Sequence, residues 1–210
     1  MEEVISLYTE DGDADPAQPY VCFDETSKQL VAETRTPLPP RPGKPERFDY
    51  EYERNGTANV FMLIAPRLGW RQVNVTARRT RVDFAEQMRL LVDDYFPQAP
   101  TIRVVLDNLN THNPASLYEA FAPAKAKRIL DRLEFVHTPK HASWLNMAEI
   151  ELSLLSRQCL KPRVPDAETW RQEVNAWQAV RNADQARIHW TFRLEDARKK
   201  LHRLYPAPSA

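Results

Sequence analysis

The stretch IRVVLDN (residues 102–108) decides the fold. It is a short run of mainly apolar and β-branched residues that ends at an acid, Asp107. This pattern is typical of a buried strand with a polar residue at its carboxyl end. A second stretch of this kind, YVCFDE (residues 20–25), carries Asp24 at the corresponding place. Adjacent parallel strands bring their carboxyl ends together at one edge of a sheet, so we expect Asp24 and Asp107 to be neighbours.

A third acid, Glu149, lies in SWLNMAE (residues 143–149), a stretch typical of a helix start. Three clustered carboxylates repel one another unless a cation lies between them. Mg²⁺, with Mn²⁺ as a substitute, prefers oxygen ligands of this kind, and three acids can hold two ions. We therefore predict a metal-dependent nuclease core in which Asp24, Asp107 and Glu149 are both the catalytic residues and the metal ligands.

Strand and helix signals alternate along the rest of the chain. Hydrophobic patterning predicts strands at 20–24, 28–34, 58–64, 70–75, 102–107 and 134–137, and helices at 83–96, 114–121, 124–133, about 143–158, 167–181 and 193–204. A meander of strands followed by strands that alternate with helices predicts an α/β fold with a mixed sheet.

Composition favours a soluble, cytoplasmic protein. No apolar run among the 210 residues approaches the length of a membrane span, and the N-terminus has no signal-peptide pattern. Cys22 and Cys159 lack the spacing of a zinc site or a disulfide framework. Residues 1–25 hold eight acids and no Lys or Arg, so residues 26–210 carry a net charge of +8 in a chain whose total is zero. Such a basic body is suited to a polyanion such as DNA, although a solvated surface would have the same composition.

A proline-rich stretch at residues 35–56 interrupts the strand signals and predicts a loop insertion. It contains Arg41, Lys44 and Arg47, which we expect, together with Lys140, to contact DNA phosphates.

Three of the stretches also carry a family resemblance. VCFDE (21–25), VLDNLNTH (105–112) and HASWLNMAEIE (141–151) resemble the DDE-transposase blocks of bacterial insertion sequences in the mariner superfamily. Similar C-terminal stretches, IHWTF (188–192) and DARKKL (196–201), extend the resemblance over nearly all of residues 18–206.

The resemblance implies an RNase H-like fold: a mixed five-stranded sheet flanked by helices, with a C-terminal helical extension. It also implies Mg²⁺-dependent cleavage and joining of transposon ends, with Asp24, Asp107 and Glu149 as the triad. Transposon ends and target DNA would be the partners, and a homodimer would form the active complex. The proline-rich loop would reach the partner subunit, with a plain flexible loop as the alternative.

Three segments follow. We expect an acidic N-terminal linker at residues 1–17, the catalytic domain at 18–160 and a helical tail at 161–210. Asp107 and Glu149 are 42 positions apart, longer than is usual in the superfamily, and an extra helix at 124–133 accounts for the excess. Only 23 residues precede Asp24, too few for helix-turn-helix modules. We therefore expect a catalytic domain that has been truncated, separated from these modules by a frameshift, or read from an internal start.

Other interpretations stay open for several residues. Glu149 follows Asn146 by three positions and could close a capping box. Glu151 is the rival third ligand, and since the two glutamates lie about 200° apart on a helix, only one can face the site. His112 and His141 are secondary candidates for phosphate or substrate contacts near the site, with an ordinary loop histidine as the alternative for each. Asn108 is a secondary candidate for orienting Asp107 or binding the scissile phosphate.

Two other functions also remain open. One is a different RNase H-like nuclease, such as a junction resolvase or an RNA–DNA hybrid nuclease. The other is an inactive, truncated transposase that binds only DNA or full-length subunits.

Overall fold

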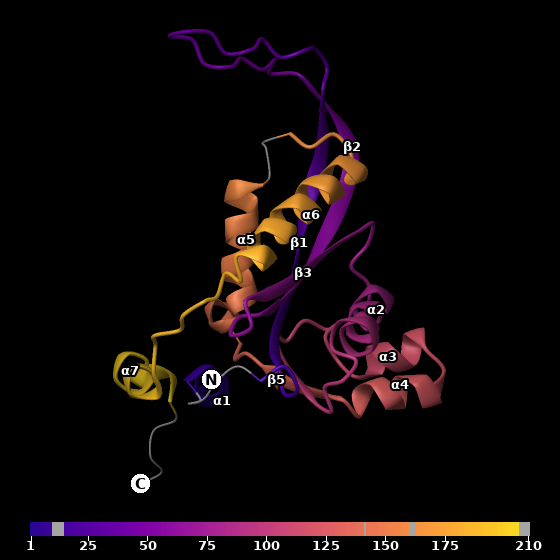
Figure 1. The fold of residues 1–210 in the computed structure, drawn as a ribbon, viewed down its shortest axis with the longest axis vertical. Helices are drawn as coiled ribbons and strands as arrows, with labels where there is room; N and C mark the ends of the chain where they lie inside the picture. The colour runs from indigo at the N-terminus through magenta and orange to yellow at the C-terminus, as the bar shows by residue number, and fades with distance from the viewer. Residues whose placement is uncertain (10–14, 141, 160–162, 206–210) are drawn as a thin grey trace.

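The fold is a sheet covered by helices on both faces, seen in a computed structural model that describes residues 1–9, 15–140, 142–159 and 163–205 (Figure 1). The strands are β1 (Tyr20–Glu33), β2 (Tyr52–Ala65), β3 (Trp70–Thr76), β4 (Ile102–Leu106) and β5 (Leu133–His137). The α-helices are α1 (Glu2–Thr9), α2 (Arg81–Leu90), α3 (Ala115–Ala120), α4 (Pro123–Leu130), α5 (Met147–Gln158), α6 (Ala167–Ala183) and α7 (Leu194–Lys200). Short π or 3₁₀ turns lie at Leu91–Tyr95, Ser143–Leu145 and His202–Leu204.

The five strands form one mixed sheet in the order β3-β2-β1-β4-β5. The pairs β1–β2 and β2–β3 are antiparallel, whereas β1–β4 and β4–β5 are parallel. This confirms the predicted mixed sheet of five strands flanked by helices. No helix in the described part of the chain has the length and apolar character that crossing a bilayer requires.

Alternating side chains give the sheet two apolar faces. On β1, Tyr20 and Cys22 belong to one buried cluster, and Val21 and Phe23 belong to the other. The first face packs against α1, α5, α6 and α7, and the second against α2, α3 and α4, as the two sides of Figure 1 show. We call them the front face and the back face.

Local sequence explains where the helices begin. The side chain of Thr80 accepts a hydrogen bond from the Asp83 amide and the Asp83 carboxylate accepts one from the Thr80 amide, which closes a capping box at the start of α2. Asp166 likewise accepts a hydrogen bond from the amide of Thr169 at the start of α6.

The N-terminal segment is not simply a linker. Residues Glu2–Thr9 form α1, and its Val4 and Ile5 are completely buried in the front-face cluster. The Tyr8 hydroxyl donates a hydrogen bond to the Leu145 carbonyl at 2.8 Å. Four of the eight residues of α1 thus have apolar side chains that the front face buries, a packing contact that the expected linker over 1–17 did not include.

The first strand is longer than expected. Instead of two strands at 20–24 and 28–34, a single strand β1 runs from Tyr20 to Glu33 and pairs with β2 from Cys22↔Ile64 to Glu33↔Tyr52, with a shift of register between Gln29 and Val31. The last five residues of the expected loop at 35–56 thus belong to β2. Beyond the body of the sheet, the two strands continue into a protruding arm of residues 34–51, visible at the top of Figure 1.

Candidate catalytic site

Asp24 and Asp107 lie side by side in the sheet register. β1 and β4 pair in parallel from Tyr20↔Arg103 to Cys22↔Val105, and extending this register by two residues places Asp24 opposite Asp107. Asp24 lies within β1 rather than at its end, because β2 continues to pair beyond it. The parallel part of the sheet nevertheless stops at this level, and residue alternation places both acids on the front face.

The first turn of α5 is attached to β1 next to Asp24. Asn146 is the N-cap: its side-chain oxygen accepts a hydrogen bond from the Ala148 amide at 3.1 Å, and its Nδ2 donates to the Phe23 carbonyl at 2.8 Å. Glu149 is the third residue of the helix and is partly buried. The bond from Asn146 therefore holds Glu149 close to the strand that carries Asp24.

The electrostatics of Asp24 show that the three acids share one environment. Burial raises the pKa of Asp24 to about 7, and the neighbouring charges of Glu25, Asp107 and Glu149 add to this effect. A hydrogen bond from the Glu25 amide to Asp24 Oδ1, at 2.8 Å, opposes it only in part. The structure thus brings the three predicted triad residues within electrostatic reach of one another.

This donor set fits a hard divalent cation, because carboxylate oxygens are its preferred ligands and a cation would relieve the repulsion at Asp24. Within the described ranges, no three His, Cys, Asp or Glu side chains are already arranged around a common point for an ion. One reason is that Asp107 Oδ1 is directed elsewhere: it accepts a hydrogen bond from the Leu109 amide at 3.0 Å and contacts His112. Ligation by all three acids would therefore require side-chain rotation.

His112 supports Asp107 from inside the protein. Its Nδ1 lies 2.6 Å from Asp107 Oδ1, and its side chain, only 1% exposed, packs against the rings of Phe23 and Phe84. Its Nε2 lies 2.9 Å from Glu25 Oε2, an ion-pair distance at which the N–H is not aligned for a hydrogen bond. Both ring nitrogens thus face carboxylates, so His112 is placed to orient Asp107 rather than to contact DNA.

The charge of His112 follows from these neighbours. Burial acts to lower its pKa, but the hydrogen bond to Asp107 and the negative charges of Glu25 and Asp107 outweigh burial and raise the pKa to about 9. Glu25 was not among the predicted site residues. Residue alternation could have indicated it, since Glu25 faces the back of the sheet, where a carboxylate requires a buried partner.

We predict that His112→Gln raises the pKa of Asp107 towards its ordinary value. The hydrogen bond from His112 is the largest cause that holds this pKa below 3.8. A ¹³C NMR titration of side-chain carboxyl groups would measure the change. His137→Gln is the matched control, since the charge of His137 makes only a lesser contribution. Equal shifts in the two variants, or no shift in His112→Gln, would contradict the role of His112.

The remaining candidates occupy different surroundings. The Asn108 amide donates to the Thr138 carbonyl and so joins the ends of β4 and β5. Lys140 is exposed two residues later, whereas His141 lies outside the described residues. Glu151 is 1% exposed and is paired with Arg71 and Arg181, which directs it away from the other acids.

The three basic residues of the proline-rich stretch lie on the arm. Arg41 and Lys44 form an isolated bridge near its tip, Arg47 pairs with Leu38, and all three basic side chains are exposed. They do not belong to the acid cluster.

Comparison with known proteins agrees with this geometry. The model of the family described as DDE superfamily endonuclease matches residues 19–171, which include all three acids. The chain belongs to this family. No curated protein matches the chain.

Two solved structures align with the chain. The Mos1 strand transfer complex aligns with a TM-score of 0.52 and 12% identity, over 80% of this chain and 51% of the other. The simian T-cell lymphotropic virus intasome in complex with PP2A regulatory subunit B56 gamma aligns with a TM-score of 0.45 and 11% identity, over 91% and 58%. The chain thus spans about half the length of the Mos1 chain, and the Mos1 match confirms the RNase H-like fold.

Proposed function

We propose that this chain is a transposase catalytic domain that performs metal-dependent DNA strand cleavage and strand transfer, as in DNA transposition and integration. One observation supports the proposal most strongly. In a member of the DDE endonuclease family, Asp24 and Asp107 lie at one level of two parallel strands, with Glu149 close enough to affect the charge of Asp24.

In this proposal Asp24, Asp107 and Glu149 hold two Mg²⁺ ions, for which Mn²⁺ can substitute. When bound, the ions would supply activation of the attacking hydroxyl and stabilisation of the leaving oxygen. His112 and the Leu109 amide hold Asp107 Oδ1, so Oδ2 would be the oxygen of that carboxylate that binds an ion. Asn146 fixes Glu149 relative to β1.

The direct test is strand cleavage by the purified chain. Cleavage of a transposon-end duplex should require Mg²⁺ or Mn²⁺, and undiminished cleavage in EDTA would contradict the metal mechanism. A four-way junction and an RNA–DNA hybrid belong in the same assay. Preference for either would favour one of the other RNase H-like nucleases.

The arm supports a proposed contact with a second copy of the chain. It exposes large apolar side chains, with Leu38 at 61%, Phe48 at 50% and Tyr50 at 86%. Exposed apolar groups of this size on a protruding segment are typical of interaction sites. We propose that the active complex is a homodimer held in part by the arm, and sedimentation of the DNA complex with and without residues 36–49 would measure this contribution.

We predict weak and unspecific DNA binding by the isolated chain. The exposed Arg41, Lys44, Arg47 and Lys140 are suited to phosphates, which carry no sequence information. The dissociation constant should be roughly 10⁻⁴–10⁻⁶ M at physiological salt and should rise steeply with salt, because binding releases counterions. Titration against a transposon-end duplex and a scrambled duplex at two salt concentrations measures both properties. A hundredfold preference for the transposon end would show that the catalytic body reads sequence.

A further inference from the structure

Three charged residues meet between α5, β3 and α6, and each of these elements contributes one of them. Glu151 of α5 is 1% exposed, Arg71 of β3 is fully buried, and Arg181 of α6 is 20% exposed. Arg181 binds Glu151 through two bonds, Nε to Oε2 at 3.1 Å and NH2 to Oε1 at 2.6 Å. Arg71 Nε lies 3.2 Å from Glu151 Oε2, in ion-pair contact without hydrogen-bond alignment. We call these three residues the buried ion cluster.

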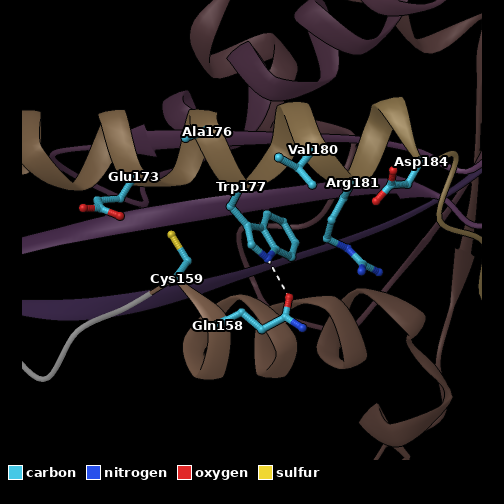
Figure 2. Close-up of a pocket in the computed structure, with 8 residues that line it drawn as sticks. All are labelled: Gln158, Cys159, Glu173, Ala176, Trp177, Val180, Arg181 and Asp184. Carbon is cyan, nitrogen blue, oxygen red and sulfur yellow. Dashed lines mark hydrogen bonds between the residues drawn. The ribbon is translucent and has the colours of Figure 1, made fainter.

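Further bonds fix the two arginines. Asn182 accepts a hydrogen bond from the Arg71 amide at 2.9 Å and donates one to the Arg71 carbonyl at 2.8 Å, which attaches α6 to β3. The Arg71 guanidinium also donates to the carbonyls of Gly69 and Ala186. Figure 2 shows Arg181 in the groove between α5 and α6, beside Trp177, whose ring centroid lies 5.4 Å from the guanidinium carbon.

A buried ion cluster is a costly way to attach a helix to a sheet. Removing charges from water is expensive, and apolar residues of similar volume often stabilise a fold as well or better. A charged cluster instead fixes the orientation of its side chains, because the two hydrogen bonds from Arg181 leave the Glu151 carboxylate little freedom of rotation. The cluster therefore specifies which side of α5 faces β3 and α6.

That orientation determines where Glu149 points. Glu149 and Glu151 are about 200° apart around the helix. The sheet order is β3-β2-β1-β4, and Glu151 is held on the β3 side. Glu149 is consequently directed towards β1 and β4, where Asp24 and Asp107 lie. The hydrogen bond from Asn146 to Phe23 fixes the position of α5 along its axis. The buried ion cluster fixes the rotation of α5 about that axis.

We propose that Glu151, Arg71 and Arg181 are positioning residues that set the rotation of α5 so that Glu149 faces the two aspartates. This inference rests on the proposed function, because it assigns Glu149 a place in the metal site. The buried ion cluster contacts neither the ion nor DNA, and acts through the direction of α5 alone.

The experiment measures Mn²⁺ affinity of the DNA-free chain by electron paramagnetic resonance, with thermal unfolding recorded for each variant. Glu151→Gln and Arg181→Gln remove different members of the cluster. Should Glu151→Gln fail to fold, Arg181→Gln still retains a neutral Arg71–Glu151 pair. Glu149→Gln removes the proposed ligand itself. Glu168→Gln is the matched control, since it removes an exposed ion pair with Arg171 on the same α6.

We expect Mn²⁺ affinity to fall about 10–100-fold in Glu151→Gln and Arg181→Gln, as for other residues that orient a ligand, with cooperative unfolding retained. Glu168→Gln should bind as the wild type does. In the cleavage assay, higher Mg²⁺ should restore the rate of the two cluster variants but not that of Glu149→Gln, a difference that a general loss of stability would not produce.

Wild-type Mn²⁺ affinity in folded Glu151→Gln and Arg181→Gln, together with weakened binding in Glu149→Gln, would overturn the positioning role and leave the proposed function standing. A wild-type chain that binds no Mn²⁺, or a Glu149→Gln variant that binds it normally, would overturn both.

Discussion

Asp24→Asn and Asp107→Asn are each expected to reduce Mg²⁺-dependent strand cleavage by at least about 10²–10³-fold, the loss seen when a group that stabilises transition-state charge is removed. Asparagine keeps the size and shape of aspartate but replaces an anionic oxygen with an amide, which a hard divalent ion binds poorly. The measurement is the single-turnover cleavage rate at saturating Mg²⁺ for the wild type and each variant.

Asp131→Asn provides the matched control for this prediction. Asp131 is exposed, pairs with Lys127 one helical turn away, and lies outside the acid cluster, so its replacement should leave cleavage unchanged. Circular dichroism would establish that all variants remain folded. A folded Asp24→Asn or Asp107→Asn chain that cleaves at the wild-type rate would remove that residue from the catalytic set.

The parts of the fold that follow from local pattern were predictable. Apolar runs that end in an acid gave the positions of β4 and of the parallel part of β1, and helical spacing gave α2 to α6 to within a few residues. The adjacency of Asp24 and Asp107 followed from a rule about parallel strands and agrees with the register of β1 and β4.

The parts that depend on distant residues were not predictable. Helical periodicity could not distinguish Glu149 from Glu151, since the difference lies in Arg71 and Arg181, which are far from α5 in the sequence. The role of His112 depends on Glu25, 87 positions earlier and on the opposite face of β1 from Asp24. The burial of the apolar side of α1 could not be predicted locally, because it depends on the front face of the sheet, which distant residues form.

The Asp24→Asn variant is also expected to be more stable than the wild type at and above pH 7 in the absence of divalent ions. The pKa of Asp24 rises from 3.8 to about 7 on folding. Between these values the folded state retains a proton that the unfolded state has lost, so wild-type stability falls as pH rises from about 4 to about 7. Below pH 4 the carboxyl is protonated in both states, so the cost of burying a charged carboxylate is absent.

Asparagine has no charge to bury, so the stability of Asp24→Asn does not fall in this way as the pH rises. At 1.36 kcal/mol per pKa unit, the difference in the free energy of unfolding should reach at most about 4 kcal/mol above pH 7 and vanish near pH 4. Urea unfolding in EDTA from pH 4 to pH 8.5 measures it, with Asp131→Asn as the control. Added Mg²⁺ should reduce the difference in the free energy of unfolding between Asp24→Asn and the wild type, because an ion that binds only the folded wild type stabilises that chain alone. Parallel stability curves for wild type and Asp24→Asn would show that folding does not raise the pKa of the Asp24 carboxyl.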